Sequence, residues 1–368
     1  MLKFIRVKRF KTLLDASFPL TELNIFSGLN GMGKSSFIQT LLLLRQSYER
    51  NTLFDRGLLL KGDYAALGTG QDILSEQAEI NSIEFILTWK DRDPLSLCFE
   101  YSSQSDLQPI IEKIDFKNPE LLSLFNQHFQ YISADRIGPK ASYEISDYYI
   151  QDLNSLGNHG EYTAHFIAEN SQRPIKIQNL RHENSSSNNF LENLDHWMSE
   201  LSPGLKIHAV MQPHINSVSL GYAFIHGKEL TADFKPQNVG FGLTYVLPVV
   251  TAILRASEGD LIIIENPESH LHPAGQTILG HMCSVAANSG VQLFIETHSD
   301  HFLNGVRVAV KDGIIEPEKV KIFFLERNKE DKDHSSKLRS PTIDLNGGIN
   351  CWPDGFFDEW DRQLEKLI

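Results

Sequence analysis

One short segment restricts the possible folds of this chain more than any other. It is GLNGMGKS, residues 28–35, which fits the pattern G-x-x-x-x-G-K-[ST]. Alternating apolar residues before Gly28 predict strands, and Phe37 and Leu41 recur at helical spacing after it. Glycines in such a segment let successive backbone N–H groups turn inward around an anion, and the positive end of the following helix points at the same place. The segment therefore predicts a phosphate-binding loop between a strand and a helix.

The side chains of this loop indicate a nucleotide with its metal ion. Lys34 is placed to reach the β- and γ-phosphates, and the Ser35 hydroxyl is placed to ligate Mg²⁺. A glycine-rich turn without a ligand would not account for both residues together. We therefore expect ATP and Mg²⁺ as ligands. The expected ATP-binding residues of the loop are Asn30, Gly31, Gly33, Lys34, Ser35 and Ser36.

The rest of the chain reads as alternating strands and helices. Strands are predicted at 2–10, 13–20, 22–27, 81–89, 95–101, 129–133, 205–212, 216–226, 260–265, 291–296 and 320–325. Helices are predicted at 34–50, 119–129, 190–201, 242–256, 273–288 and 300–311, and loops at 62–75, 182–190 and 327–342. The βαβ alternation of the last third favours a mainly parallel sheet with helices on both faces. The predicted parts are 1–75 with the loop, a mixed insert at 76–230, and a C-terminal part at 231–368.

Composition and charge limit the class of protein and its partners. Hydrophobic residues make up 41% and charged residues 22%, and no apolar run approaches the roughly 18 residues of a membrane span. We therefore expect a cytoplasmic protein without a membrane partner. The formal net charge of −13 argues against a surface that grips nucleic acid throughout. Arg6, Lys8 and Arg9 alternate with apolar residues, which favours the solvated face of an edge strand over a DNA-binding patch.

A second segment, LIIIENPESHLHP at 261–273, carries acids at the end of a buried strand. The aliphatic run 261–264 is typical of a strand buried on both faces, and Glu265 follows at its carboxyl end, where ligands bind in open α/β sheets. Glu265 is therefore the expected metal-holding acid. Asn266 stands where a second acid is expected and cannot act as a base. Glu268 could orient the attacking water, or it could only cap the next helix.

Histidines follow both acid-bearing strands. The strand predicted at 291–296 ends in Thr297 and His298, next to the metal-holding strand. His298 is well placed there to contact the γ-phosphate, so it is the third expected catalytic residue beside the two glutamates. His270 and His272 lie two residues apart without a third ligand at metal-site spacing, so no zinc site is expected.

Several motifs in the same order give the chain a resemblance to a known family. The opening KFIRVKRFKTL, the segment FPLTELNIFSGLNGMGKSS, and the later ENPESHLHP and ETHSDHFLN resemble the head domain of ABC-type ATPases of the SMC, RecF and OLD kind. More narrowly, the chain resembles prokaryotic ABC/AAA-type P-loop ATPases that carry a C-terminal domain of unknown function. The motifs are YISADRIGP (131–139), LGNHGEYTAHFI (156–167), NVGFGLTYVLPVV (238–250), IIENPESHLHPAGQ (263–276) and INCWPDGFFD (349–358).

This resemblance implies a fold, an assembly and further site residues. The fold is an α/β ABC-type ATPase head, with a β-rich N-terminal subdomain, a mainly parallel sheet flanked by helices, and a mixed α/β insert. The assembly is a homodimer that sandwiches two ATP molecules, each held by one subunit's phosphate loop and the other's signature segment. By position, Gly240, Gly242 and Thr244 form that segment here. The segment departs from the usual S-G-G-Q, so packing on the core stays open as its other role. Gln71 resembles the Q-loop position that senses Mg²⁺ and nucleotide.

The resemblance also implies an activity and two biological roles. Slow ATP hydrolysis is expected, with ATP acting as dimer glue or as a switch. The first hypothesis is an ATP-dependent dimer that controls an operon-encoded effector, a nuclease or toxin in prokaryotic anti-phage defence. The alternative is an ATP-gated DNA-binding protein of the RecF/SMC type in DNA repair or maintenance. A nuclease centre within this chain is not expected, because Glu326, Asp331 and Asp333 lie too close together and fit a solvated charge run.

Overall fold

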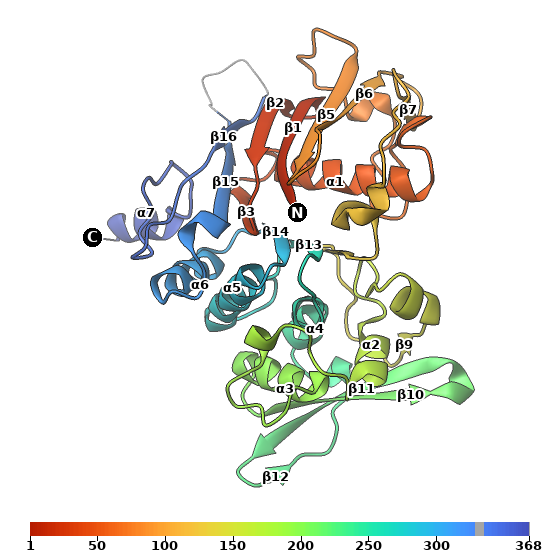
Figure 1. Cartoon of the computed structure of the whole chain (residues 1–368). Coiled ribbons are helices and arrows are strands. Elements are labelled where there is room, and N and C mark those ends of the chain that lie inside the picture. Colours follow the sequence, from red (N-terminus) through yellow and green to blue (C-terminus); the bar gives the residue numbers. More distant parts are fainter. Residues whose placement is uncertain (328–334, 368) are drawn as a thin grey trace. The chain divides into compact units, whose positions relative to one another are not determined.

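The computed structural model describes residues 1–327 and 335–367, and the chain divides into two compact units (Figure 1). Unit 1 comprises Met1–Asn126, Val320–Thr342 and Ile349–Ile368, and unit 2 comprises Gln127–Lys319 and Ile343–Gly348. This division differs from the predicted one, which placed boundaries after residues 75 and 230. The reason is that the strands predicted at 81–89 and 95–101 belong to the same sheet as the N-terminal strand.

An antiparallel sheet forms one part of unit 1. Its order is β2-β1-β5-β6, and its strands are β1 (Leu2–Phe10), β2 (Leu13–Pro19), β5 (Ser82–Trp89) and β6 (Leu95–Glu100). Ile5 and Val7 of β1 are fully buried, as the alternating pattern predicts. Strand β1 is hydrogen-bonded on both sides, however, so the edge-strand prediction for it is wrong.

The other part of unit 1 carries the phosphate loop. Strand β3 (Leu23–Gly28) pairs in parallel with β15 (Val320–Glu326), and helix α1 (Lys34–Glu49) follows the loop. Phe26 of β3 stacks on Phe37 of α1 at 4.3 Å and on Phe323 of β15 at 4.9 Å between ring centroids. These buried rings fix the strand and the helix that hold the loop between them.

The remaining elements of unit 1 include two corrections. The helix predicted at 119–129 is instead two 3₁₀ turns, Pro119–Leu121 and Ser123–Phe125, because Leu122 between them is extended. The loop predicted at 327–342 contains strand β16 (Lys337–Arg339), which pairs with the end of β15. Asp331 and Asp333, named above as unlikely nuclease acids, lie outside the described residues. The other elements are β4 (Gly57–Leu59), β7 (Leu107–Pro109), the 3₁₀ turn Gly70–Asp72 and α7 (Glu359–Glu365).

Unit 2 is built on parallel strands with helices around them. Strand β13 (Leu261–Glu265) pairs in parallel with β8 (Phe129–Ile132) on one side and β14 (Gln292–Glu296) on the other, and the position of β14 beside β13 was predicted. Residues 261–264 are at most 2% exposed, which explains their purely aliphatic sequence. Helices α5 and α6 lie side by side (Figure 1). The helices are α2 (Thr163–Asn170), α3 (Phe190–Leu201), α4 (Phe241–Leu254), α5 (Pro273–Asn288) and α6 (Asp300–Lys311).

A second, antiparallel sheet in unit 2 lies within the range predicted for the mixed insert. Its strands are β9 (Tyr143–Glu144), β10 (Leu205–Gln212), β11 (Ser217–His226) and β12 (Glu229–Leu230). Strand β11 pairs with each of the other three. Short helical turns connect these elements, a π-helical turn at Tyr148–Asp152 and 3₁₀ turns at Gln178–Leu180, Pro213–Ile215, Pro236–Asn238 and Pro317–Lys319. Within the described part of the chain, no helix combines the length and the apolar character needed to cross a bilayer.

Candidate functional site

The phosphate loop of unit 1 adopts the backbone conformation that its sequence predicts. Gly28, Gly31 and Gly33 have φ values of 137°, 77° and 93°, a region that side-chain-bearing residues rarely enter. Helix α1 begins directly after Gly33 and has no side-chain cap at its N-terminus. A helix N-terminus of this kind presents N–H groups and a partial positive charge to an anion.

The polar side chains of the loop lie around this turn. The Lys34 ammonium donates to the carbonyls of Gly28 at 2.9 Å and Leu29 at 3.0 Å, so it is folded over the loop. Asn30, like Gly31, is exposed at the tip. Phosphate oxygens are stronger acceptors than these carbonyls, because hydrogen bonds between charged groups are stronger than those to neutral ones.

The two serines of the loop differ in exposure. Ser35 is exposed on the first turn of α1, whereas Ser36 is 8% exposed and its carbonyl accepts from Thr40. The exposed Ser35 hydroxyl therefore fits the predicted metal ligand. The buried Ser36 fits a role in shaping the first turn of the helix.

Two hydroxyl groups that the sequence did not single out lie against the loop. A methyl group on Gly33 would lie 2.6 Å from Thr12 Oγ1 and 3.0 Å from Ser336 Oγ. Both oxygens are buried, and neither has a hydrogen-bond partner among the described residues. Buried polar groups are nearly always paired, so two orphan hydroxyls beside a glycine-rich turn fit a polar ligand such as a nucleotide. The only sequence signal for Thr12 was its place directly after the first predicted strand.

Thr12 also lines a pocket in unit 1. It has a volume of about 370 Å³, and its lining includes Lys11, Thr12, Gln71, Gln77 and Arg327. Gln71, which the family resemblance singled out, thus shares a pocket with a residue that touches Gly33. The structure brings Gln71 and the phosphate loop to the same region of unit 1.

Residues 265–268, called the acid turn below, begin with Glu265, which is the last residue of β13. Its register partner on β14 is Glu296, so the carboxyl ends of the two strands meet as predicted. Glu265 Oε2 accepts from the Ala134 N–H at 3.1 Å. Burial raises the pKa of Glu265 above its ordinary value, against hydrogen bonds from Ala134 and Tyr131 that lower it. A half-buried carboxylate at a strand end is suited to a divalent cation, whose charge would offset the loss of hydration.

Asn266 explains why the expected pair of adjacent acids is absent. Its φ is 45°, in the left-handed region that asparagine tolerates better than glutamate does. Its N–H donates to the Glu296 carbonyl at 2.7 Å. The chain therefore turns away at this position instead of continuing β13, and the residue type follows from the backbone.

Glu268 has the environment expected of a general base. Its Oε1 accepts from the His298 N–H at 2.7 Å, and its Oε2 is buried without a partner at normal distance among the described residues. Burial raises the pKa of Glu268, and the His298 N–H is the strongest influence in the opposite direction. The alternative capping role does not hold, because His272 is the N-cap of α5 and accepts from the Ala274 N–H. Glu265, Glu268 and His298 thus lie together, with the His298 side chain exposed.

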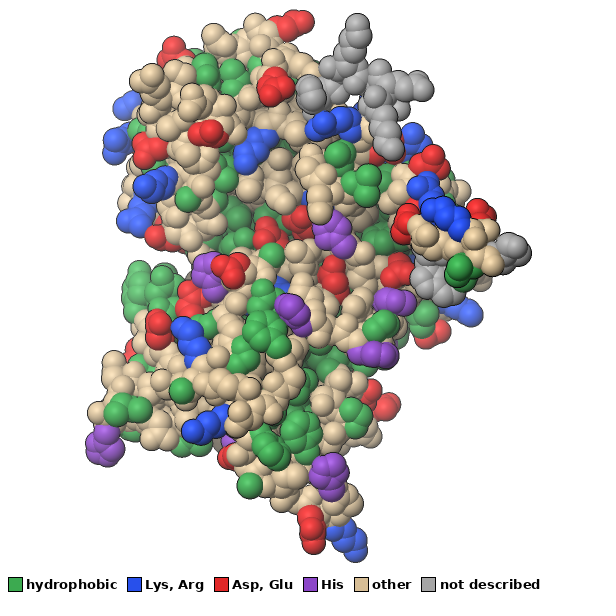
Figure 2. Space-filling model, turned by 180° about the vertical axis from the view of Figure 1, so that it is seen from behind, with side chains coloured by type: hydrophobic (Ala, Val, Ile, Leu, Met, Phe, Trp, Pro, Cys, Tyr) green, Lys and Arg blue, Asp and Glu red, His purple; other side chains and the backbone are tan. Residues whose placement is uncertain are grey.

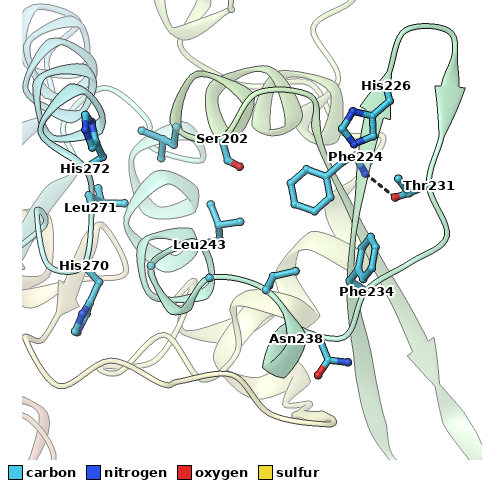
Figure 3. Close-up of a pocket in the computed structure, with 14 residues that line it drawn as sticks. Ser202, Phe224, His226, Thr231, Phe234, Asn238, Leu243, His270, Leu271 and His272 are labelled. Carbon is cyan, nitrogen blue, oxygen red and sulfur yellow. Dashed lines mark hydrogen bonds between the residues drawn. The ribbon is translucent and has the colours of Figure 1, made fainter.

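The signature-like segment opens helix α4 and lines a pocket of about 510 Å³. Figure 3 shows Phe224, His226 and Phe234 on one side of this pocket and His270, Leu271 and His272 on the other. Gly240 and Gly242 line it as well.

The three predicted residues of this segment have different surroundings. No atom lies within 4 Å of where a Gly240 methyl would be, so Gly240 is open to a partner. A methyl on Gly242 would lie 2.3 Å from the His270 carbonyl oxygen, so close packing requires glycine there. Thr244 is 3% exposed, and its hydroxyl lies 3.2 Å from that of Tyr222. Gly242 and Thr244 therefore have packing roles within unit 2.

One group of side chains elsewhere in unit 2 has the spacing of a metal site. The ligand atoms of Asp147, His165 and Glu169 lie within 4.8 Å of one another. However, His165 Nδ1 accepts from the Ser146 N–H, which places the ring proton on Nε2, facing the carboxylates at 3.6 Å. A protonated nitrogen cannot ligate a metal, so the group acts as a polar contact instead.

The basic residues of β1 give the DNA-binding alternative no support. Arg6 pairs with Asp15 at 2.6 Å, and Lys8 pairs with Glu84 at 3.0 Å. Figure 2 shows Lys and Arg side chains interspersed with acidic ones on the face that it presents. Phosphate contacts need cations that are not already neutralised.

Comparison with known proteins identifies the family. Residues 99–304, more than half of the chain, match the family described as "AAA domain, putative AbiEii toxin, Type IV TA system". The chain belongs to this AAA family. The matched segment contains the acid turn and the signature-like segment, and it begins after the phosphate loop. Residues 315–367 match a second family, "Protein of unknown function (DUF3696)". No curated protein matches this AAA-family chain in sequence.

Solved structures show the fold of the AAA-family chain. An SMC head bound to the C-terminal winged-helix domain of ScpA matches with a TM-score of 0.54 and 13% identity, over 93% of this chain and 98% of the other. An SMC head from Pyrococcus furiosus with an extended coiled coil, bound to the C-terminal domain of ScpA, matches with a TM-score of 0.51 and 12% identity, over 100% and 99%. At these identities the likeness concerns the fold, which is that of an ABC-type ATPase head. The predicted fold class and family are therefore confirmed.

Proposed function

We propose that this protein binds Mg-ATP through its phosphate loop and hydrolyses it slowly with the acids of unit 2. The observation that carries the proposal is the loop at 28–35, whose three left-handed glycines, uncapped helix and flanking orphan hydroxyls fit a polyphosphate. The AAA family and the SMC-head fold support the same chemistry.

Some residues of the site bind the nucleotide and its metal ion, and others take part in hydrolysis. Lys34 moves its hydrogen bonds from the loop carbonyls to phosphate oxygens. Ser35, Glu265 and Gln71 would be the protein ligands of Mg²⁺, and Gln71 lies in the wall of the pocket that Thr12 also lines. Such an ion, when bound, would neutralise charge on the β- and γ-phosphates.

The base and the histidine complete the proposed mechanism. Glu268 accepts the proton of the attacking water on Oε2, while the His298 N–H keeps Oε1 in place. The exposed His298 ring contacts the γ-phosphate. Turnover is slow because the base lies three residues beyond the metal-holding acid, on a turn instead of on the strand itself.

The biological role that we propose is an ATP-dependent homodimer that controls an effector protein. Gly240, open at the N-terminus of α4, supplies the contact to the partner subunit's nucleotide, with Gly242 and Thr244 supporting it from behind. The family description names a toxin of a toxin–antitoxin system, and both SMC heads were solved with a domain of ScpA bound. A nuclease or toxin effector in prokaryotic anti-phage defence fits these relatives.

Nucleotide binding is tested by calorimetry on the full chain. Lys34→Ala should abolish measurable Mg-ATP binding and turnover, since removing one buried charged contact to a phosphate costs about 10²-fold or more. Lys61→Ala removes an exposed lysine of the same unit outside the pocket and should change neither. Equal ATP affinity in the Lys34→Ala and Lys61→Ala variants would refute the proposal.

The dimer is tested by light scattering with the Glu268→Gln variant, which should retain ATP. Its mass should double when Mg-ATP is added and return to that of one chain when the nucleotide is removed. The same measurement on Gly240→Trp should show ATP binding without the doubling, because a bulky side chain would block the open position. A mass of Glu268→Gln that does not respond to Mg-ATP, or a mass of Gly240→Trp that doubles, would contradict the switch.

A further inference from the structure

Arg136 is a buried cation whose hydrogen bonds all go to backbone carbonyls. It lies four residues beyond β8 and is 4% exposed. Its Nη1 donates to the carbonyls of Ser133 at 3.0 Å and Glu265 at 2.7 Å, and its Nη2 donates to the Asn266 carbonyl at 2.7 Å. Two of these three acceptors are the residues that begin the acid turn.

Burying the Arg136 cation in this way costs free energy, so its position calls for an explanation. Taking a cation out of water is unfavourable unless its surroundings compensate, and buried guanidinium groups commonly pair with a carboxylate. Arg136 uses its fork on neutral carbonyls instead, while the carboxylates of Glu265 and Glu268 act on it only through space. Burial lowers the pKa of Arg136 to about 10, so the group stays charged at neutral pH.

Arg136 also connects the acid turn to the signature-like helix. Its guanidinium carbon lies 4.5 Å from the ring centroid of Tyr245, on the second turn of α4. The Tyr245 hydroxyl donates to the Ala134 carbonyl and accepts from the Arg136 N–H at 3.2 Å. The segment after β8, the acid turn and α4 are thus joined through one arginine and one tyrosine.

A second contact joins the same two elements. The ring of His270, two residues after Glu268, packs edge-on against Tyr245 at 5.0 Å and against Phe241 at 4.8 Å between centroids. Phe241 is the first residue of α4 and is 44% exposed. A displacement of the start of α4 would therefore reach both ends of the acid turn, through Tyr245 at Arg136 and through His270 beyond Glu268.

We propose that Arg136 is a positioning residue that, with Tyr245, holds the Glu265–Asn266 turn in the shape that presents Glu268 and couples this turn to the N-terminus of α4. The inference rests on the proposed function, because it assigns the residue a role in ATP hydrolysis. Only a planar fork can donate to carbonyls on two sides and stack on a ring, so lysine cannot replace arginine here. In a variant that lacks Arg136, Glu265 and Glu268 would still be present but would be displaced.

The experiment compares the buried Arg136 with the half-buried Arg255, which also belongs to unit 2. Arg255 also donates to neutral oxygens, those of Asn154 and Gln130, and lies 5.6 Å from the ring of Phe166, but it makes no contact with the acid turn. Arg136→Lys and Arg255→Lys should lower the melting temperature to a similar degree. Arg136→Lys should also lower kcat about 10-fold or more with the KM for ATP changed less than about threefold, the pattern of a lost transition-state contact. Arg255→Lys should keep kcat.

Two further tests separate positioning from general stability. Tyr245→Phe removes the hydroxyl bridge, and because it acts through the same contact, the Arg136→Lys/Tyr245→Phe double variant should lose clearly less than the product of the two single effects on kcat. Guanidinium chloride at low millimolar concentration should raise the kcat of Arg136→Ala but not that of Arg255→Ala. The lysine variant keeps the test decisive if the alanine variants do not fold.

The outcomes distinguish this inference from the proposed function. If the unaltered chain hydrolyses ATP but Arg136→Lys keeps its kcat, or loses it no more than Arg255→Lys, the positioning role is refuted and the ATPase stands. If the unaltered chain neither binds nor hydrolyses Mg-ATP, both fail.

Discussion

The phosphate loop of unit 1 and the acid turn of unit 2 are built from different parts of the polypeptide. The loop is a backbone site, in which glycines with positive φ leave Asn30 and Gly31 exposed. The acid turn is a side-chain site, in which Glu265 and Glu268 are half-buried and Glu265 depends on a group more than a hundred residues away, as the Ala134–Glu265 hydrogen bond shows. The difference predicts that changes to the loop alter binding, whereas changes to the turn alter turnover.

A large effect on this comparison should come from the metal-holding acid. Glu265→Gln keeps an acceptor for the Ala134 N–H but removes the charge, so turnover should fall by roughly 10²-fold, since several kcal/mol of charge stabilisation is lost. The residual rate should need a higher Mg²⁺ concentration. Steady-state rates across a Mg²⁺ titration measure both effects, and an unchanged Mg²⁺ dependence would assign the metal elsewhere.

Two glycines of the loop sharpen the comparison on the binding side. Gly33→Ala places a methyl 2.6 Å from Thr12 Oγ1 at a φ of 93°, whereas Gly31→Ala meets no atom within 4 Å and is strained only by its φ of 77°. We expect Mg-ATP affinity to fall about 10-fold or more for Gly33→Ala and clearly less for Gly31→Ala, since left-handed strain alone costs roughly 1–2 kcal/mol. Calorimetric titration decides this, and equal losses would mean that the Thr12 contact is unimportant.

Substitutions of Asn266 should have a smaller effect, and they test the backbone conformation of the acid turn. Because its φ is 45°, Asn266→Ala should cost about 1 kcal/mol of stability, whereas Asn266→Gly should be close to neutral. Asn266→Glu, which restores the usual adjacent acid, should not speed hydrolysis, because the side chain follows the left-handed backbone. Chemical denaturation and turnover assays measure these effects, and a faster Asn266→Glu variant would contradict the interpretation of this turn.

The smallest expected effect is a pH dependence of stability. Burial raises the folded-state pKa of Glu268 above its ordinary value of 4.5, so the stability from this group is present at low pH and is lost as the pH rises through the raised pKa. Glu268→Gln cannot ionise and should become more stable than the unaltered chain as the pH rises above 4.5. Melting curves from pH 4 to 8 would show this, and a difference that shrinks with rising pH would contradict it.

The contrast between the phosphate loop and the acid turn also explains which features could be predicted from the sequence. The loop was predictable because its glycines are required by local backbone conformation, and β13 because a strand buried on both faces must be aliphatic. The helix predicted at 119–129 does not form, because the backbone of Leu122 is extended. The motif around Arg136 was noticed without a role, because its hydrogen bonds reach residues about 130 positions away. Such contacts leave no spacing pattern in a single sequence.

The central claim is that this chain is an ATPase in which Glu268 is the base, and one measurement tests it most directly. Mg-ATP affinity and single-turnover hydrolysis are measured on the same samples of the unaltered chain and of Glu268→Gln. The amide keeps the acceptor for the His298 N–H but cannot take a proton. We predict equal affinity within about twofold and a hydrolysis rate lower by about 10²- to 10³-fold, the range of general base catalysis. An unchanged rate in Glu268→Gln, with ATP still bound, would contradict the account.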